Sequence, residues 1–380
     1  MGVCANFHHR FRELPSMKIA QIAPLYETVP PTYYGGTERV ISYLTDELVD
    51  LGHDVTLFAS GASQTKARLV PMRPKALWLD DAPLKSPVVA HLAMLEQVRA
   101  RADEFDVLHF HLSHFMHFPF FKECAQRTVT TPHGRLDYVD LAPSYGLWPR
   151  YPMISISDRQ RRPLADANWL ATVYHGLPLD LYRPPADRPG GTGNYLAFLG
   201  RFSRDKRPDR AIEIAEKSGL SLKMAAKVGD DDGPYFKEHV EPRIDGRVIQ
   251  HVGEIDDAGK PGFLGDAAAL LMPIDWPEPF GLVVIEAFAC GTPVIAWNNG
   301  AMPEIIDQGV TGFVVDTIAD AVDAVEKVRA LDRARIREVF ERRFSVAAMA
   351  RNYVAAYEAL LKGGGAASVP GGRAVAAPSP

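Results

Sequence analysis

Two successive series of strand and helix patterns, separated by a stretch rich in proline and glycine, constrain the fold of this chain more than any other feature. The first series starts at Met17 and the second at Tyr195, and in both of them short apolar runs alternate with helical patterns. Strands that alternate with helices predict right-handed crossovers and parallel sheets. With 380 residues, the chain has room for about two domains of ordinary size. The sequence therefore predicts an α/β protein with two domains.

The domain boundaries follow from where these patterns begin and end. We predict strands at 18–23, 55–58, 106–110, 128–131, 195–199, 222–226, 248–252, 269–272, 293–296 and 313–315. The chain then divides into a disordered leader (1–16), a first domain (17–177), a linker (178–193), a second domain (194–344), a last helix (345–362) and a disordered Gly/Ala/Pro-rich tail (363–380).

Composition excludes several classes of function. The net charge of −5 is too small to indicate a nucleic-acid partner, and no apolar run reaches the length of a membrane span. The three cysteines are scattered, without a C-x-x-C pair, which argues against a disulfide framework and against a cysteine zinc site. The N-terminal residues contain no apolar region typical of a secretory signal. We therefore expect a cytoplasmic protein.

Glycines and cations gather at two strand-to-helix junctions. In the first domain, Gly35-Gly36 precedes a helical pattern that Gly52 ends. In the second domain, Arg201 and Lys206 flank a turn before Pro208, which suits the first turn of a helix. Backbone N–H groups at a glycine turn and paired cations both suit an anion such as a diphosphate. A plain turn and a solvated basic loop are the alternative interpretations.

The most informative segment runs from Trp276 to Ala296 and has the pattern of a loop, a helix, a glycine turn and a buried strand. Its helix is apolar almost all round but contains Glu286, and Glu278 stands just before the helix. A helical spacing of eight residues puts the two carboxylates about 12 Å apart, too far for a glycosidase pair. Two carboxylates that contact one ligand at different depths fit better. A buried Glu286 bonded only to neighbouring backbone is the alternative.

These residues resemble the signature of the family 4 glycosyltransferases (glycosyl transferases group 1), and the resemblance extends from Met17 to about Leu361. It rests on the run E-P-F-G-L-V-x-x-E-A-x-A-x-G-T-P-V-x-A, on Gly35-Gly36, on the strand 106–111, on Thr131-Pro132-His133-Gly134, on Arg201 with Lys206, and on 309–313. The resemblance implies a GT-B fold: two doubly wound Rossmann-like domains face each other across a cleft, and the last helix crosses back to the first domain. It also implies a retaining transferase that uses a nucleotide sugar.

The resemblance assigns a role to each matching residue. Glu286 is expected to bind the ribose hydroxyls, and Glu278 the hydroxyls of the donor sugar. His133 is expected to lie under that sugar and bond one of its hydroxyls. Arg201 and Lys206 would bind the diphosphate and stabilise the charge that grows as it leaves. Backbone N–H groups are expected to contact phosphate or sugar at Gly36, Phe280, Gly281, Leu282 and Val283.

The resemblance also implies which partners and cofactors to expect. The donor is a nucleotide sugar, for which we favour UDP, and neither a metal nor another cofactor is expected because the cations take its place. The donor sugar, the acceptor (a glycan, a lipid or a small molecule) and the oligomeric state stay open. A GT-B nucleotide-sugar epimerase and a non-catalytic sugar-nucleotide-binding protein are the alternative functions.

Three segments depart from the family pattern. His175-Gly176-Leu177-Pro178 stands where Asn-Gly-Val-Asp is usual, and Pro273-Ile274-Asp275-Trp276 replaces the usual Pro-Ser before the first glutamate. The turn at 227–233 carries the acidic run Asp230-Asp231-Asp232. Neither of the first two changes removes a charged ligand-binding group, but both are expected to reshape the donor pocket. The acidic run leaves the surroundings of the nucleotide base open.

One stretch combines histidines with phenylalanines, between His109 and Phe121. His114 and His117 would meet on a helix at i,i+3 and suggest a metal site, but no carboxylate lies in phase with them. The phenylalanines allow a weak peripheral contact of the first domain with a membrane. We favour the interpretation that they form part of the core.

Overall fold

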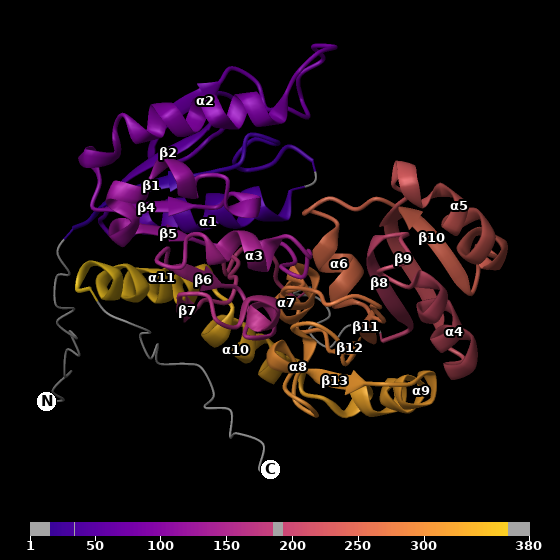
Figure 1. The fold of residues 1–380 in the computed structure, drawn as a ribbon. Helices are drawn as coiled ribbons and strands as arrows, with labels where there is room; N and C mark the ends of the chain where they lie inside the picture. The colour runs from indigo at the N-terminus through magenta and orange to yellow at the C-terminus, as the bar shows by residue number, and fades with distance from the viewer. Residues whose placement is uncertain (1–15, 34, 185–192, 364–380) are drawn as a thin grey trace, which may run out of the picture.

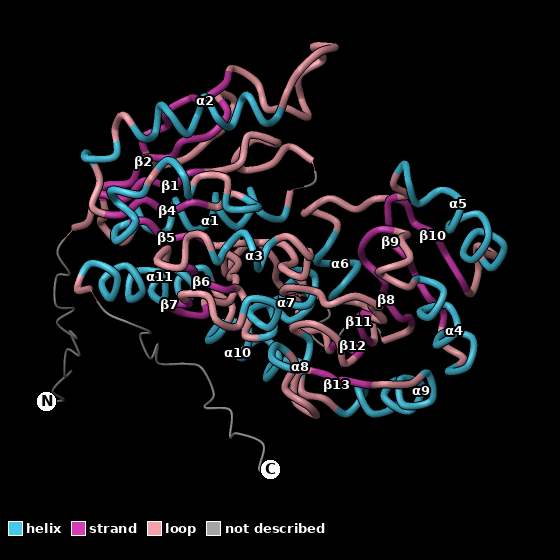
Figure 2. The backbone as a smooth tube through the Cα atoms, viewed as in Figure 1, coloured by secondary structure: helices cyan, strands magenta, loops and turns pink. Residues whose placement is uncertain are grey.

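The computed structural model describes residues 16–33, 35–184 and 193–363. Nearly all of the predicted leader and tail, together with 185–192 of the predicted linker, lie outside these residues. The described chain forms two parallel sheets, each packed with helices, so the predicted α/β architecture with two Rossmann-like domains is confirmed (Figures 1 and 2).

The first domain contains a seven-stranded sheet in which every neighbouring pair is parallel. Its order is β3 (Arg68–Arg73), β2 (Asp54–Ser60), β1 (Lys18–Ile22), β4 (Val107–Phe110), β5 (Thr128–Thr130), β6 (Met153–Ser155) and β7 (Trp169–Thr172). The three strands that the sequence did not reveal are β3, β6 and β7. β3 lies at an edge and carries arginines, while β6 and β7 are only 3 and 4 residues long.

The second domain contains a six-stranded parallel sheet, and all its strands were predicted from the sequence. Its order is β10 (Ile249–Gly253), β9 (Ser221–Lys227), β8 (Tyr195–Arg201), β11 (Ala269–Met272), β12 (Val294–Trp297) and β13 (Gly312–Val315). In both sheets the strand order reverses next to the first strand of the domain. In such sheets, ligands bind outside the carboxyl ends of the strands at this reversal.

The helices cover both sheets and connect their strands. They are α1 (Gly36–Asp50), α2 (Pro87–Arg99), α3 (Leu141–Gly146), α4 (Pro208–Ser218), α5 (Gly233–Tyr235), α6 (Lys260–Gly265), α7 (Leu282–Ala289), α8 (Met302–Ile305), α9 (Ile318–Lys327), α10 (Arg333–Arg343) and α11 (Val346–Leu361). A 3₁₀ helix, η5 (Arg159–Leu164), follows β6 and contributes to the cleft.

The last helix, α11, crosses back to the first domain as expected (Figure 1). Its residues Tyr353 and Tyr357 are fully buried in one apolar cluster with Val40 and Leu44 of α1. Where the chain crosses, Leu177 N–H donates to Phe344 O at 2.9 Å, and Val346 N–H donates to Leu177 O at 2.9 Å. The two connections between the domains are therefore hydrogen-bonded to each other.

The stretch rich in phenylalanine is part of the core of the first domain. Phe115, Phe118 and Phe121 are buried and join Phe110 in one apolar cluster. The helical relation between His114 and His117 is wrong, because His114 has a left-handed backbone (φ 61°) and the chain turns there. His117 is fully buried instead, and its Nε2 lies 2.8 Å from Thr130 Oγ1. Across the described ranges, no three His, Cys, Asp or Glu side chains are grouped to hold a metal ion.

None of the helices in the described part of the chain combines the length and the apolar character that a bilayer crossing requires.

Candidate active site in the cleft between the domains

Two helix N-termini, one from each domain, meet in the cleft. A Cβ at Gly36, the first residue of α1, would lie 3.4 Å from Leu282 Cδ1 at the start of α7. Neither helix has a side-chain cap, because the N-cap residues are Gly35 and Gly281. Their first N–H groups and the positive ends of their dipoles are therefore available to an anion.

The two N-cap glycines are required by local geometry. A side chain at Gly35 would meet Glu38 Oε2 and Pro31 Cβ, each at 2.8 Å. Gly281 has a φ of 90°, in the left-handed region that favours glycine. The structure thus places Gly36, Phe280, Gly281, Leu282 and Val283, whose N–H groups were predicted to bind phosphate or sugar, at this junction.

Lys206 and Glu278 form an ion pair beside the junction. Their side chains are 20% and 12% exposed, and the Lys206 ammonium also lies 5.1 Å from the centroid of the Trp276 ring. Gly300 packs directly against the Glu278 backbone, where any side chain would overlap it. The next residue, Ala301, donates its N–H to Glu278 O at 2.9 Å and so fixes the position of the Glu278 backbone. An ammonium group has three donors, so Lys206 can keep Glu278 and still donate to a phosphate oxygen.

Arg201 is placed differently from Lys206. It ends β8, its side chain is 47% exposed, and its closest ionic partner is Asp232, at 3.8 Å, in the acidic turn. No hydrogen bond or ion pair in the described ranges connects Arg201 to Lys206 or to Glu278. Joint binding of one diphosphate by both cations therefore stays a prediction.

Glu286 lies in the middle of α7, only 5% exposed, with Lys260 as its ionic partner. Lys260 Nζ lies 2.9 Å from Glu286 Oε1 and 3.1 Å from the Tyr182 hydroxyl. The alternative of a glutamate bonded only to neighbouring backbone is thereby wrong. Contact between Glu286 and ribose stays a prediction.

Asp257 extends this cluster to the first domain. Its carboxylate accepts hydrogen bonds from the Tyr182 hydroxyl, at 2.5 Å, and from Arg39 of α1. Burial alone would raise the pKa of Asp257, but these two donors and the positive charges of Lys260 and Arg39 outweigh burial and lower the pKa to about 2. Sequence reasoning missed Arg39, Tyr182, Asp257 and Lys260, because they come from separate segments and match no motif.

His133 ends a buried chain of hydrogen bonds. His133 Nε2 lies 2.9 Å from His111 Nδ1, and His111 Nε2 lies 2.6 Å from Gln21 Oε1. The Gln21 amide donates to the Tyr357 hydroxyl of α11 at 3.1 Å. Burial lowers the pKa of His133 to about 3, so its imidazole is neutral at physiological pH. Its Nδ1 has no hydrogen-bond partner among the described residues.

His175, one of the departures from the family pattern, lies between His133 and Phe280 of the second domain. The two imidazole rings stack with centroids 5.3 Å apart, and His175 contacts the Phe280 ring at 4.8 Å. His133 is therefore next to the loop that carries Glu278 and precedes α7. Its contact with a sugar hydroxyl stays a prediction.

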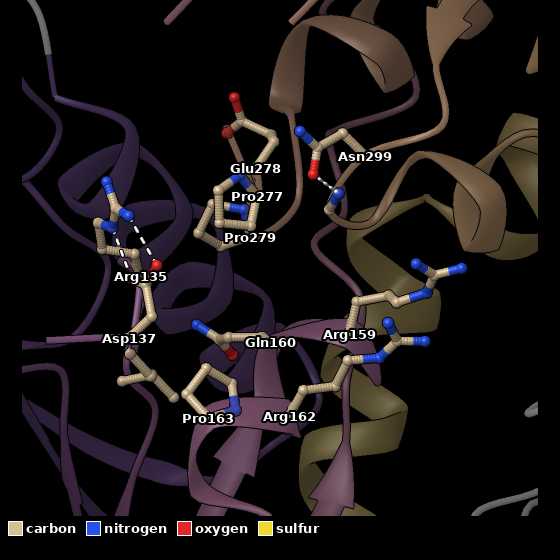
Figure 3. Close-up of a pocket in the computed structure, with 12 residues that line it drawn as sticks. Arg135, Asp137, Arg159, Gln160, Arg162, Pro163, Pro277, Glu278, Pro279 and Asn299 are labelled. Atoms are coloured by element: carbon tan, nitrogen blue, oxygen red, sulfur yellow. Dashed lines mark hydrogen bonds and ion pairs between the residues drawn. The ribbon is translucent and has the colours of Figure 1, made fainter. Parts of the chain in front are cut away.

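A pocket of about 110 Å³ opens beside Glu278 and is lined by both domains. Pro277, Glu278 and Pro279 form one wall, and residues of the loop 135–137 and of η5 form the other walls (Figure 3). Gln160 of η5 donates through Nε2 to Pro132 O and Gly134 O, both at 2.8 Å. Gln160 thereby fixes the loop that contains His133.

The cleft and the two sheets define the GT-B class of fold, which comparison with solved structures supports. AviGT4, a glycosyltransferase involved in avilamycin A biosynthesis, has a TM-score of 0.69 at 23% identity, over 91% of this chain and 98% of that one. Anabaena HepE in complex with UDP and glucose has a TM-score of 0.68 at 17% identity, over 90% of this chain and 100% of that one. At these identities the likeness concerns the fold alone.

Sequence comparison identifies the family. The family described as glycosyl transferases group 1 matches residues 185–342, and glycosyltransferase family 4 matches residues 34–202. The chain belongs to the group 1, family 4 glycosyltransferases. The D-inositol 3-phosphate glycosyltransferase of Segniliparus rotundus is 31% identical over an alignment of 230 residues that covers 53% of this chain and 49% of that relative. The chain thus spans about half the length of the curated relatives that it matches.

Proposed function

We propose that the protein is a retaining glycosyltransferase that transfers a sugar from a UDP-sugar to an acceptor hydroxyl. The observation that carries this proposal is the approach of the uncapped N-termini of α1 and α7 beside the Lys206–Glu278 pair. Two anion-binding helix ends, a cation and a carboxylate together suit a diphosphate that is joined to a ring with several hydroxyls. The complex of HepE with UDP and glucose supports the choice of UDP as the nucleotide.

The chemistry follows from where negative charge develops. As the bond between the anomeric carbon and the diphosphate breaks, its electron pair moves to the diphosphate oxygen, which Lys206 and the helix N-termini stabilise. The acceptor hydroxyl attacks the same face of the oxocarbenium-like sugar, and its proton passes to the departing oxygen. Glu278 and His133 orient the sugar, and Glu286 holds the ribose. The reaction requires no metal because Lys206, Arg201 and the helix ends supply the positive charge.

A UDP-release assay with a panel of UDP-, GDP- and ADP-sugars tests the proposal. We expect UDP-sugars to give the fastest release, and the product to keep the anomeric configuration of the donor, as read by NMR. A nucleotide sugar that changes its sugar configuration without UDP release would indicate the epimerase. Binding without release or transfer, in the presence of a broad acceptor panel, would indicate the non-catalytic alternative.

The Lys206→Ala variant links the assay to the site. Lys217→Ala is its matched control, since Lys217 lies on α4 in an exposed ion pair with Glu213 at 2.7 Å. Loss of release in Lys206→Ala alone is the expected result, and equal rates in both variants would contradict the proposal.

A further inference from the structure

Two arginines that line the pocket beside Glu278, Arg159 and Arg162, form no ion pair with the described residues. Of the other charged residues that line the pocket, Arg135 donates two hydrogen bonds of 2.6 Å to Asp137, and Glu278 is paired with Lys206. The side chains of Arg159 and Arg162 donate no hydrogen bond and form no ion pair within the described ranges. The pocket therefore retains two positive charges on the side of the first domain.

Local structure places the two arginines side by side. They belong to the 3₁₀ helix η5, in which side chains at i and i+3 eclipse each other. Figure 3 shows both side chains running in the same direction, away from Glu278. Burial lowers the pKa of Arg159 and the neighbouring charge of Arg162 lowers it further, while the Glu304 carboxylate partly opposes both effects. Two like charges held together in this way favour an anion between or beside them.

The helix that carries the arginines is fixed from both domains. Glu304 of α8, in the second domain, accepts the backbone N–H groups of Asp158 at 2.7 Å and Arg159 at 2.6 Å. Both Glu304 oxygens are thus used by backbone donors. Within η5, Gln160 accepts from Ile156 N–H at 3.0 Å and donates to the loop 132–134. The two guanidinium groups therefore extend from a backbone that is held in place.

We propose that Arg159 and Arg162 bind a phosphate group of the acceptor. This inference rests on the proposed function and names the substrate class that function would use. A guanidinium presents a planar fork that matches phosphate oxygens, and two forks supply the charge that balances a dianion. Because Glu278 lines the same pocket, an acceptor held at the arginines by its phosphate remains next to the site proposed for the donor sugar.

Binding of inorganic phosphate to the protein saturated with UDP is the direct test, because UDP blocks binding of phosphate at the diphosphate site. We expect Arg159→Gln and Arg162→Gln each to weaken phosphate binding by about ten- to hundredfold in calorimetry, and the double variant to abolish it. Arg150→Gln is the control, since it removes the same charge from an exposed residue of the same domain outside the pocket. Unchanged phosphate affinity in the double variant would overturn the inference, as would the absence of phosphate binding to the wild type.

A second variant guards against an effect on folding. Arg159→Lys keeps the charge but loses the planar fork, and we expect it to bind phosphate more weakly than wild type but more strongly than Arg159→Gln. Thermal unfolding of each variant shows whether the fold is kept.

Two further arms distinguish the source of the phosphate. Faster UDP release with glycerol 3-phosphate than with glycerol indicates a water-soluble acceptor. Binding to phosphatidylglycerol vesicles but not to phosphatidylcholine vesicles indicates a lipid headgroup. We expect the double variant to lose whichever effect is present.

Failure of the inference can be told apart from failure of the proposed function. Hydrolysis of a UDP-sugar by water needs only the donor site, so we expect the arginine double variant to retain it. A wild type that binds phosphate through the arginines but neither binds nor hydrolyses any UDP-sugar would overturn the proposed function alone.

Discussion

Glu286, the one charged residue of the apolar helix α7, forms an ion pair with Lys260 at the start of α6, with Nζ 2.9 Å from Oε1. Burying a carboxylate and an ammonium is costly unless each has a partner. A pair that served stability alone would be replaceable by apolar residues of similar size. The first two predictions separate stability from ligand binding at this pair.

We predict that Glu286→Ala weakens binding of both UDP and the UDP-sugar, because the ribose is common to both. Loss of a hydrogen bond to a charged group is expected to weaken the binding free energy by about 1.5–3 kcal/mol. Calorimetry with UDP measures the effect. Glu213→Ala, which removes an exposed carboxylate from α4, is the matched control. Equal UDP affinity in wild type and Glu286→Ala would remove Glu286 from the site.

We predict that the effects of replacing Lys260 and Glu286 on the free energy of unfolding are strongly non-additive. Lys260→Met leaves the Glu286 carboxylate buried without its ionic partner, so it is expected to lower the free energy of unfolding by about 3–5 kcal/mol. Glu286→Leu is expected to cost less, because Lys260 Nζ keeps a second ionic partner, Asp257, at 3.2 Å. The double variant removes both charges and is expected to recover most of this loss while still failing to bind UDP. Urea denaturation of the four proteins measures the cycle. Additive losses would show that the two side chains do not depend on each other.

The fold could be predicted because both halves repeat short buried strands and helices with one apolar face. The runs at β1, β4 and β11 are apolar or nearly so, which is typical of parallel strands covered on both sides. β6 and β7 were missed although strands of the same length, such as β5 and β11, were recognised, so shortness alone does not explain the omission. The crossing of α11 followed from the family resemblance, whereas its fully buried tyrosines show the physical reason for it.

The site was predictable only where a local motif carries the chemistry. Gly36, Lys206, Glu278 and Glu286 stand in or beside recognisable strand-to-helix junctions. Partners brought in from distant segments left no such signal. Lys260 is 26 residues from Glu286 in the chain, and Arg39 is 218 residues from Asp257. Tyr182 fell within the predicted linker, but it is fully buried against the second domain.

Lys206→Ala is predicted to lower kcat far more than it changes the KM for the donor. Negative charge on the diphosphate grows as the sugar bond breaks, so a cation there stabilises the transition state more than the ground state. Removal of a preorganised donor of this kind costs about 10²–10³ in rate. Steady-state UDP release measures both constants. A kcat within about twofold of wild type would show that Lys206 contributes almost nothing.

Arg201 tests whether two cations share one diphosphate. If they do, Arg201→Ala lowers kcat as well, and the double variant loses less than the product of the two single losses. Arg201 is exposed and lies 3.8 Å from Asp232, so its charge can be balanced without the diphosphate. In that case kcat is unchanged in Arg201→Ala. That outcome would leave Lys206 and the helix N-termini as the main diphosphate contacts.

Turnover is predicted to survive EDTA. The positive charge that a divalent ion would provide is supplied by Lys206 and by the N-termini of α1 and α7, which have no side-chain caps. UDP release is measured in chelator and again after addition of Mg²⁺ or Mn²⁺. Complete loss in chelator with full recovery on metal addition would contradict this expectation.

Stability is predicted to fall as the pH drops below neutrality, because several histidines are buried in the neutral form. Burial lowers the pKa of His117 to about 3, whereas a histidine in the unfolded chain titrates near 6.5. Between these values the unfolded chain binds more protons than the folded one, so the free energy of unfolding decreases as the pH falls. The stabilisation is complete above about 6.5 and is lost progressively towards about 3, at about 1.4 kcal/mol per pH unit for each such group.

The His117→Phe variant tests how much of this pH dependence of stability comes from His117. The histidine ring stacks on Phe110 with centroids 4.1 Å apart, an arrangement that a phenylalanine can keep, while the hydrogen bond to Thr130 is lost. We expect the variant to be less stable at pH 7. Between pH 6 and pH 5 its free energy of unfolding is expected to fall less steeply than that of wild type, by the slope that corresponds to about one bound proton. Urea denaturation at each pH measures the slope. His239→Phe, on an exposed histidine, is expected to keep the wild-type slope. If His117→Phe kept the full slope as well, protonation of His117 would play no part in the acid sensitivity.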